Sequence, residues 1–302
     1  MSSAVQTADW IAVDWGTSNL RAWAMSRSGT ALWSGGSDKG MSALAREDFE
    51  GALLEVVAPS IGAEPLDVVA CGMVGSRQGW AEAPYTACPC PARPSGFTRA
   101  QTNDPRLNVH IIPGVKQETP ADVMRGEETQ IAGFLALNPG WDGVMCLPGT
   151  HTKWVEVSAG EIVSFQTAMT GELFALLSTH SVLRHSVAPE GWDADAFSEA
   201  VDDAISKPER LAARLFSLRA ESLLHDLGGA ASRARLSGFL IGAELAAARP
   251  YWLGRDIAII GAAAIARIYG DALAAQAVPA TIADGPAMTL AGLNAAYKEL
   301  RS

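Results

Sequence analysis

Two short stretches of the chain place polar residues directly after an apolar run. In the first, Asp14 follows the run 10–13 and precedes Gly16, Thr17 and Ser18. Backbone N–H groups and hydroxyls in such a turn form a concavity that suits a phosphate. A carboxylate would repel phosphates unless a divalent cation lay between them, and one or two carboxylates commonly hold Mg²⁺ in this way. The stretch therefore predicts either a phosphate and metal site or an ordinary hairpin in which Asp14 only begins a turn.

The stretch 143–157 repeats this arrangement, with an apolar strand, a turn rich in hydroxyls and a second strand. The turn is formed by Gly149, Thr150, His151, Thr152 and Lys153. Neither turn fits the Gly-x-x-x-x-Gly-Lys-Ser/Thr loop and neither is followed by a helix, which disfavours a P-loop enzyme. A lone loop histidine is more often a local hydrogen-bonding residue, so the turn as a whole carries the prediction. Two such hairpins, one opening each half of the chain, favour the phosphate interpretation of both.

The elements that position these turns follow from the hydrophobic pattern. Short apolar runs predict strands at 11–13, 20–25, 67–71, 108–112, 143–147, 256–261 and 278–283, and a further strand near 31–36. Helical spacing predicts helices over 46–58, 121–137, much of 172–250, 262–275 and 286–300, with Pro120 in the first turn of the second. The Pro-, Gly- and Cys-rich region 79–96 predicts no regular element. Strands that alternate with helices indicate an α/β fold.

Composition narrows the function classes. The chain has 302 residues, of which 48% are hydrophobic and 19% charged, so two globular domains of ordinary size are expected. A net charge of −10 disfavours a nucleic-acid binder. Four scattered cysteines predict reduced thiols, without a disulfide framework or a zinc motif. No signal sequence opens the chain and no apolar run approaches the roughly 18 residues of a membrane span, so a cytoplasmic protein is expected.

Several phrases together resemble one family of sugar kinases. They are "VDWGTSNLRAW", "GMVGSRQGWAEAPYTACPCP", "PGV…DVMRGEETQ", "LPGTHTKW" and "TGELFALLSTHSVL", which occur in this order between residues 13 and 183. The set is similar to the 2-dehydro-3-deoxygalactonokinase family, within the superfamily of sugar kinases, actin and heat-shock chaperone ATPases. The stretch "IIGAAAIARIY" and the closing helix match more loosely.

The resemblance implies a two-domain actin-like ATPase (ribonuclease H-like) fold with a nucleotide cleft between the domains. The expected domains are 1–138 for the sugar acid and phosphates, with the closing helix 286–302 packed back on it, and 139–285 for the nucleotide. The implied reaction transfers the γ-phosphoryl group of ATP, with Mg²⁺, to the 6-hydroxyl of 2-dehydro-3-deoxy-D-galactonate in galactonate breakdown. The expected partner is this small molecule, without nucleic acid or membrane, and a homodimer would be unsurprising.

The resemblance also gives roles to the two turns. Asp14 would hold Mg²⁺ and act in catalysis, while the turns around Thr17 and Thr150 would bind the phosphates of ATP. Arg21 would either point back to the same phosphates or be a surface residue of its strand. Gly261 and Ala262 would leave room for the adenosine in the second domain, although simple strand–helix packing explains them as well.

The general base is the least determined residue. Related kinases place an Asp at the start of the helix that precedes the second domain, and Asp122 stands in the matching place. A residue there also has a structural role at the positive end of the helix. Glu127 and Glu128 are rivals, although Glu128 would ordinarily be a solvated charge. Arg125 would lie near either ligand.

An acidic substrate requires a cation, and Arg pairs with a carboxylate better than Lys does. Arg77 is the best candidate, in the loop after the strand 67–71, because open α/β sheets bind ligands at the carboxyl ends of strands. The remaining predicted substrate contacts are Ser76, Gln78, Trp80, Tyr85, Lys39 and Gly40. For Trp80 and Tyr85, packing of the loop is an equally good explanation. Glu172 is expected to cap a helix.

Two other functions stay open. The chain would also suit a kinase of the same fold for another sugar or sugar acid, or a non-catalytic ATP-dependent sensor. The sequence does not decide the epimer of the sugar acid or the oligomeric state.

Overall fold

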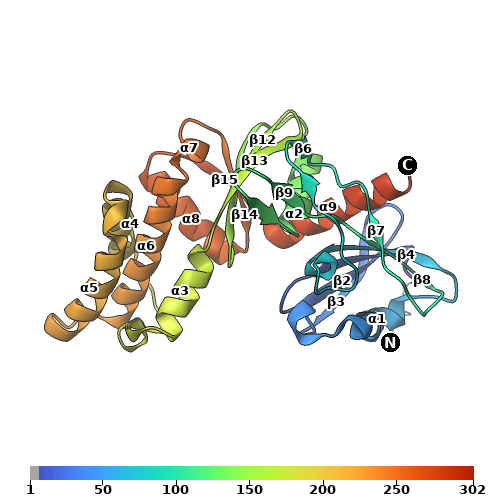
Figure 1. The fold of residues 1–302 in the computed structure, drawn as a ribbon, viewed down its shortest axis with the longest axis horizontal. Coiled ribbons are helices and arrows are strands. Elements are labelled where there is room, and N and C mark those ends of the chain that lie inside the picture. Colours follow the sequence, from blue (N-terminus) through green and yellow to red (C-terminus); the bar gives the residue numbers. More distant parts are fainter. Residues whose placement is uncertain (1–6) are drawn as a thin grey trace. The chain divides into compact units, whose positions relative to one another are not determined.

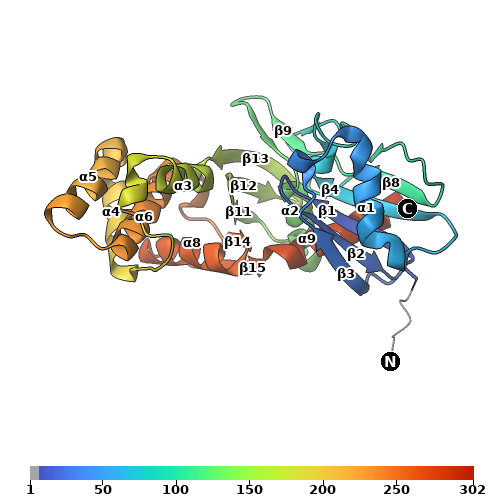
Figure 2. The same cartoon turned by 90° about the horizontal axis from the view of Figure 1, so that it is seen from below.

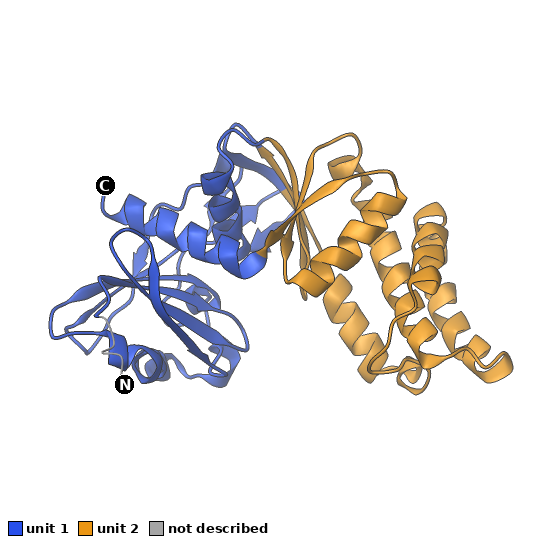
Figure 3. Cartoon of the chain, turned by 180° about the vertical axis from the view of Figure 1, so that it is seen from behind, with its two compact units in different colours: residues 1–141, 158–164, 285–302 blue, residues 142–157, 165–284 orange. Residues whose placement is uncertain are grey.

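The computed structural model describes residues 7–302 and divides into two compact units (Figure 3). Unit 1 comprises residues 1–141, 158–164 and 285–302, and unit 2 comprises residues 142–157 and 165–284. Residues 1–6 lie outside the described residues. The prediction that no signal sequence opens the chain concerns these residues in part. Between residues 7 and 302, no helix combines the length and the apolar character needed to cross a membrane. The predicted boundary between functional domains at 138/139 stays a prediction.

Unit 1 is built on a six-stranded sheet of order β3-β2-β1-β4-β8-β7. Its strands are β1 (Trp10–Trp15), β2 (Leu20–Met25), β3 (Ala31–Ser37), β4 (Leu66–Gly72), β7 (Thr98–Arg99) and β8 (Leu107–Ile111). β1, β2 and β3 are antiparallel neighbours, while β1, β4 and β8 run parallel. The predicted opening hairpin and the strand that follows it are therefore confirmed.

Helices cover both faces of this sheet (Figure 1). They are α1 (Phe49–Val57) and α9 (Gly285–Leu300). Ile11 and Val13 of β1 lie in the core that includes α1, whereas Trp10 lies in the core that includes α9 and stacks on Tyr297 at 4.3 Å between ring centroids. Because both faces of β1 are buried, its sequence is a continuous apolar run and not an alternating one.

A third helix of unit 1, α2 (Glu127–Leu137), lies against α9 with backbone touching backbone. A Cβ atom on Gly133 would lie 1.9 Å from the carbonyl oxygen of Met288. A Cβ atom on Gly292 would lie 1.9 Å from that of Thr129. Only glycine leaves room for this approach, so α9 fixes the position of α2.

The structure differs from the prediction between residues 115 and 127. The strands β9 (Val115–Gln117) and β10 (Asp122–Met124) form an antiparallel hairpin, and α2 begins only at Glu127. Gly126, with φ of +107°, separates the hairpin from the helix, since a right-handed helix cannot pass through that conformation. The predicted helical turn after Pro120 is therefore wrong.

The region 79–96 also contains regular structure, contrary to the prediction. The two-residue strands β5 (Thr86–Ala87) and β6 (Cys90–Pro91) lie in it. β5 pairs with β9, and β6 pairs with the start of β13 (Glu161–Ala168). Two residues are too few to show the alternating pattern of a strand in the sequence. These strands are therefore recognised only from their pairing with a partner strand.

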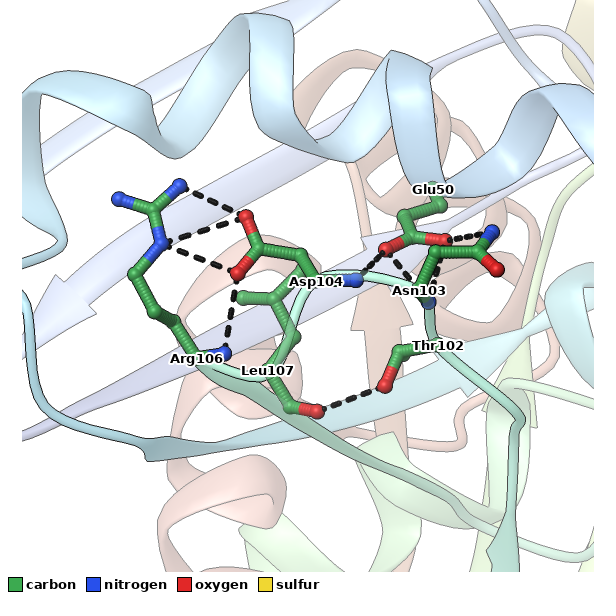
Figure 4. Close-up of polar contacts among 6 residues, drawn as sticks. All are labelled: Glu50, Thr102, Asn103, Asp104, Arg106 and Leu107. Carbon is green, nitrogen blue, oxygen red and sulfur yellow. Dashed lines mark hydrogen bonds and ion pairs between the residues drawn. The ribbon is translucent and has the colours of Figure 1, made fainter.

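Figure 4 shows how α1 is tied to the loop before β8. The carboxylate of Glu50 accepts hydrogen bonds from the backbone N–H groups of Asn103 and Asp104, at 2.9 and 2.6 Å, and from the Asn103 amide. Asp104 in turn accepts from Arg106, which lowers the pKa of the Asp104 carboxyl to about 2. These acids are held by neighbours within the loop, so their role is structural.

Unit 2 repeats the arrangement of strands seen in unit 1. Its strands are β11 (Gly143–Leu147), β12 (Thr152–Ser158), β14 (Ile257–Gly261), β15 (Ala280–Asp284) and the end of β13, which follows β12 in the order of the sheet. β11 and β12 form an antiparallel hairpin, and β14 and β15 follow in parallel on the other side of β11. The two hairpins β1–β2 and β11–β12 thus occupy equivalent places in their own sheets, as the repeated sequence pattern predicted.

Unit 2 also contains α-helices. They are α3 (Thr170–Thr179), α4 (Ala194–Ser206), α5 (Leu211–Leu224), α6 (Gly229–Ala247), α7 (Arg249–Trp252) and α8 (Ala263–Ala275). α4, α5 and α6 lie side by side (Figure 2). α4 approaches α6 closely because a Cβ atom on Gly238 or Gly242 would lie 2.6 Å from a carbonyl oxygen of α4.

Candidate functional site

The first turn places a carboxylate at the end of a buried strand. Asp14 and Arg21 are opposite each other on β1 and β2, and Arg21 Nη2 forms an ion pair with Asp14 Oδ2. The Asp14 side chain is 17% exposed and that of Arg21 is 43% exposed. Arg21 thus neutralises Asp14, and its predicted contact with phosphates stays a prediction.

The turn between β1 and β2 is braced from one side. Gly16 N–H donates to Asn19 O at 2.9 Å, and the N–H groups of Met41 and Ser42 donate to Gly16 O and Thr17 O, both at 3.0 Å. Gly40 lies so close that a Cβ atom there would be 2.2 Å from the backbone of the turn. Thr17 and Ser18 are exposed. The brace leaves them at the surface, where a ligand can reach them.

Glu128 is a buried carboxylate in the first turn of α2 and not the solvated charge that the sequence predicted. The residue is 4% exposed. Its Oε2 accepts from Gly126 N–H at 2.6 Å and its Oε1 from Thr129 Oγ1 at 3.2 Å. Burial, and then the charge of Glu127, raise the pKa of Glu128 to about 8. The carboxyl group therefore exchanges its proton near neutral pH.

The ends of β1 and β4 and the start of α2 meet at one point. A Cβ atom on Gly72, the last residue of β4, would lie 2.6 Å from Trp15 O and 3.6 Å from Asp14 Oδ1. A Cβ atom on Gly126 would lie 3.5 Å from Gly72 Cα. Both glycines have positive φ, +90° and +107°. Burial, then the charges of Asp14 and Glu128, raise the pKa of the Cys71 thiol, so both carboxylates lie near it.

Asp122 lies elsewhere than the sequence predicted. It is the first residue of β10, its side chain is partly exposed, and its Oδ1 accepts from Val123 N–H at 2.7 Å. Asp122 was expected to be the base because it would stand at the start of a helix, and the structure contradicts that reason. The residues that occupy that place are Glu127 and Glu128.

The predicted substrate residues after β4 are divided between surface and core. Arg77 has an 81% exposed side chain, 3.5 Å from Glu82, and Gln78 is also exposed. Trp80 is 7% exposed and packs against Trp15 and Phe49, so its ring belongs to the core. The structure thus supports the packing explanation for Trp80.

Arg125 is the more buried cation of this region. Its guanidinium lies 4.3 Å from the centroid of the Tyr85 ring, and Nη2 donates to Ala83 O at 2.7 Å. Its Nε and Nη1, like the Ser76 hydroxyl, are buried without a hydrogen-bond partner among the described residues. Lys39, by contrast, pairs with Glu55 at 2.5 Å, while its carbonyl accepts from Trp15 Nε1.

The second turn, in unit 2, rests on the start of α3. Glu172 N–H donates to Thr150 O at 2.9 Å, and a Cβ atom on Gly171 would lie 2.2 Å from Gly149 O. His151 Nε2 lies 2.6 Å from Glu172 Oε2, so Glu172 pairs with the turn and does not cap the helix. Gly149 and Thr150 are exposed.

Two further residues of this predicted clasp are buried. Thr152 is fully buried, and Lys153 is 4% exposed with its Nζ 3.3 Å from His151 O. The part of the turn that faces solvent is therefore Gly149 to His151.

A cavity of about 150 Å³ lies beside this turn within unit 2. It is lined by Gly149, Thr170, Gly171, Phe174, Trp192, Arg233, Ser237, Leu240, Ile241, Ile265, Ile268 and Tyr269. Gly261 and Ala262 do not line it. A Cβ atom on Gly261 would lie 3.3 Å from Pro148, so this glycine leaves room for the turn itself.

Sequence reasoning missed most residues of this cavity, because they come from α3, α6 and α8. One signal was present, namely Glu244 as the lone charge in the apolar stretch 238–247. It is 5% exposed and accepts hydrogen bonds from Trp154 and Tyr269, each at 2.8 Å, and from Thr170.

The described residues contain no cluster of three or more His, Cys, Asp or Glu side chains that could hold a metal ion. Mg²⁺ bound with nucleotide phosphates needs only one or two protein carboxylates, since waters and phosphates complete its shell. Asp14, partly exposed at the end of β1, fits that requirement.

Comparison with known proteins agrees with this architecture. The family model described as 2-keto-3-deoxy-galactonokinase matches residues 14–296. "Probable 2-dehydro-3-deoxygalactonokinase DgoK1" of Rhizobium meliloti (strain 1021) is 37% identical over 305 residues, covering 96% of this chain and 97% of the relative. The 2-dehydro-3-deoxygalactonokinase of Escherichia coli (strain K12) is 36% identical over 290 residues, covering 95% and 97%.

Solved structures confirm the predicted sugar-kinase fold. A crystal structure from Sinorhizobium meliloti, assigned as a 2-dehydro-3-deoxygalactonokinase protein, superposes with a TM-score of 0.88 at 36% identity and covers 96% of both chains. Component A of the (R)-2-hydroxyglutaryl-CoA dehydratase of Acidaminococcus fermentans, at 12% identity and a TM-score of 0.53, shares the fold alone. The chain belongs to the 2-keto-3-deoxy-galactonokinase family.

Proposed function

We propose that the protein transfers the γ-phosphoryl group of ATP to the 6-hydroxyl of 2-dehydro-3-deoxy-D-galactonate. The identity of the substrate is supported by family membership and by the names of the two relatives described above. The observation on this chain that best supports the chemistry is the buried carboxyl of Glu128, with its pKa raised to about 8 beside the strand end that carries Asp14.

Glu128 is proposed as the general base in place of Asp122. A base that accepts the proton of a sugar hydroxyl works best when its pKa lies near the working pH. Burial supplies that pKa here, and the hydrogen bond from Gly126 N–H keeps the carboxylate at the start of α2. Deprotonated Glu128 would orient the hydroxyl and accept its proton as the phosphoryl group is transferred.

Asp14 is proposed to hold Mg²⁺. When bound, the ion would neutralise charge on the β- and γ-phosphate oxygens. The residues of the chain do the rest. The turn around Thr17 and Ser18 would donate hydrogen bonds to phosphate oxygens, and the Arg21 guanidinium would balance the charge of Asp14 when the site is empty of nucleotide.

The second turn and the adjacent cavity are proposed to bind ATP within unit 2. Gly149 and Thr150 would contact phosphates, and the cavity walls formed by Phe174, Ile265 and Ile268 would contact the base. The cavity, and not the immediate surroundings of Gly261 and Ala262, is proposed for the adenine. The predicted place of the nucleotide between the two domains stays a prediction.

Two cations are candidates for the substrate carboxylate. Arg77 is exposed and only loosely paired with Glu82, so it is free to move toward a ligand. Arg125 is held by Tyr85 and Ala83, and its unpartnered N–H groups would gain from an anion. We propose Arg77 as the carboxylate ligand, with Ser76, Gln78 and Tyr85 nearby, and Arg125 as the residue that holds the loop.

Replacement Arg77→Ala is expected to raise the KM for the sugar acid about tenfold or more and to change kcat little, because a charge-assisted contact made equally in the ground and transition states is lost. Steady-state kinetics at saturating ATP measures this. Arg99→Ala, another exposed arginine of unit 1, is the control. An unchanged KM in Arg77→Ala together with a raised KM in Arg125→Lys would indicate that Arg125, and not Arg77, binds the substrate carboxylate.

The pH dependence of turnover follows from Glu128. Between pH 6 and 8, kcat/KM should rise up to about tenfold per pH unit and then level off, because only the ionised carboxylate accepts a proton. Glu127→Gln removes a negative charge that raises this pKa, so the rising limb should move to lower pH. A profile that is flat from pH 6 to 9 would count against Glu128.

ADP release with Mg-ATP tests the proposed function across an acceptor panel. The panel contains 2-dehydro-3-deoxy-galactonate, its gluconate epimer, glucose and no acceptor. Turnover with the first acceptor far above the others is the expected result. Preference for another acceptor would favour a different sugar kinase, and ATP binding without acceptor-dependent turnover would favour the sensor.

The cellular setting is also a proposal. Cys71, Cys88, Cys90 and Cys146 are free thiols, which supports the proposed cytoplasmic location. A homodimer stays a prediction for light scattering to test.

A further inference from the structure

Helix α6 carries a single charged side chain into the core of unit 2. Glu244 Oε1 accepts from Trp154 Nε1 at 2.8 Å, and its Oε2 accepts from Tyr269 OH at 2.8 Å and from Thr170 Oγ1. A buried carboxylate is costly unless it is fully hydrogen-bonded. An apolar side chain would fill the same place without that cost, so this carboxylate calls for a reason beyond packing.

The hydrogen bonds around Glu244 have a fixed direction. The hydroxyls of Thr170 and Tyr269 both donate to Glu244 Oε2. Tyr269 has no second hydrogen, and in its 2.9 Å contact with Thr152 the threonine hydroxyl must therefore donate. One carboxylate thus orients three hydroxyls from three different elements.

These elements surround the proposed nucleotide cavity. Thr170 begins α3 and Tyr269 lies on α8, and both line the cavity. Thr152 begins β12 directly after the second turn. The start of α3 also supports that turn, since Glu172 N–H donates to Thr150 O and Gly171 lies against Gly149. A shift of Glu244 would therefore move the cavity wall and the phosphate turn together.

We propose that Glu244 is a positioning residue for the nucleotide, which acts through Thr170, Tyr269 and Thr152 without touching ATP. The inference rests on the proposed function, because it assumes that the cavity in unit 2 receives the nucleotide. The role proposed for Glu244 differs from the roles proposed for the acids of unit 1, Asp14 at the metal and Glu128 at the sugar acid.

Glu244→Gln tests the proposal. The Gln amide accepts on one side only, and its NH₂ group would face hydroxyls that now donate, so the hydroxyls of Thr170 and Tyr269 must reverse. The KM for ATP and the Kd for ADP, measured by calorimetry, should each rise about tenfold or more, because hydrogen bonds to a charged group are lost. The KM for the sugar acid should stay within about twofold.

Trp252→Phe is the matched control. Trp252 is 2% exposed in the same core and donates to Leu245 O at 2.8 Å, but it does not line the cavity. The Trp252→Phe substitution should lower the melting temperature and leave the KM for ATP unchanged. If Glu244→Gln does not fold, Tyr269→Phe removes one hydroxyl from the same carboxylate and should raise the KM for ATP in the same direction.

The outcomes separate this inference from the proposed function. A folded Glu244→Gln or Tyr269→Phe variant with an unchanged KM for ATP, or with equal rises in both KM values, would overturn the positioning role. Wild-type protein that does not bind ADP would instead overturn the proposed nucleotide function, and the inference with it.

Discussion

Glu128→Gln is expected to lower kcat about 1,000-fold and at the same time to make the protein more stable at pH 8. The loss of activity follows from removing the proposed general base, whose usual contribution is about 10²- to 10⁴-fold. The gain in stability follows from the raised pKa. Folding moves the pKa of this carboxyl from its ordinary 4.5 to about 8, so the folded state binds the proton more tightly than the unfolded state.

The sign of the pH effect is fixed by that difference. The contribution of Glu128 to the free energy of unfolding is complete below about pH 4.5 and is lost as the pH rises to about 8. Gln does not titrate, so the stability difference between variant and wild type should be near zero at pH 4.5 and reach a few kcal/mol at pH 8. Thermal melts at a series of pH values measure it.

Asp122→Asn provides the control for both readouts. It removes a partly exposed carboxylate of β10 and should change kcat less than tenfold and the melting temperature little. A large loss of kcat in Asp122→Asn with an active Glu128→Gln would restore Asp122 as the base. A Glu128→Gln variant that is inactive but also unfolded at pH 8 would contradict the burial argument.

Asp14→Asn is expected to lower kcat about 100-fold or more and to raise the Mg²⁺ concentration needed for half-maximal activity. A neutral amide is a weaker ligand for Mg²⁺ than a carboxylate, and the lost charge neutralisation acts directly on the transferred phosphoryl group. Kinetics with Mg²⁺ titrated at fixed ATP measure both effects.

Asp9→Asn is the matched control for Asp14→Asn, because Asp9 precedes the other end of β1 and also pairs with an arginine, Arg27, at 3.2 Å. It should leave the Mg²⁺ dependence unchanged. Equal kinetics in wild type and Asp14→Asn at low Mg²⁺ would remove Asp14 from the metal site.

The strands that carry the two turns could be predicted because each has a clear pattern in its own sequence. β1 and β11 are buried on both faces, so a run of apolar residues marks each of them without knowledge of its partners. The hairpin β9–β10 could not be predicted in this way. Its strands have three residues each, and they are regular because they pair with each other and because β9 also pairs with β5.

The candidate site shows the same limit. The place of Asp14 at the end of a strand could be predicted because its strand and turn are adjacent in the sequence. Glu128 was expected to be solvated, since only the packed structure reveals which face of α2 is covered. The pKa that supports its role comes from burial, and burial at this position depends on chain segments far away in the sequence.

The glycine contacts between α2 and α9 have a consequence for the order in which a ribosome makes this chain. Gly292 lies against Thr129, the neighbour of the proposed base, yet residues 285–300 are synthesised after everything else in the site. A nascent chain that ends before α9 contains both of the turns proposed to bind phosphate but lacks the surface against which α2, the helix of Glu128, packs. If Glu128 is the base, activity is therefore expected only after α9 has been synthesised and has packed against α2.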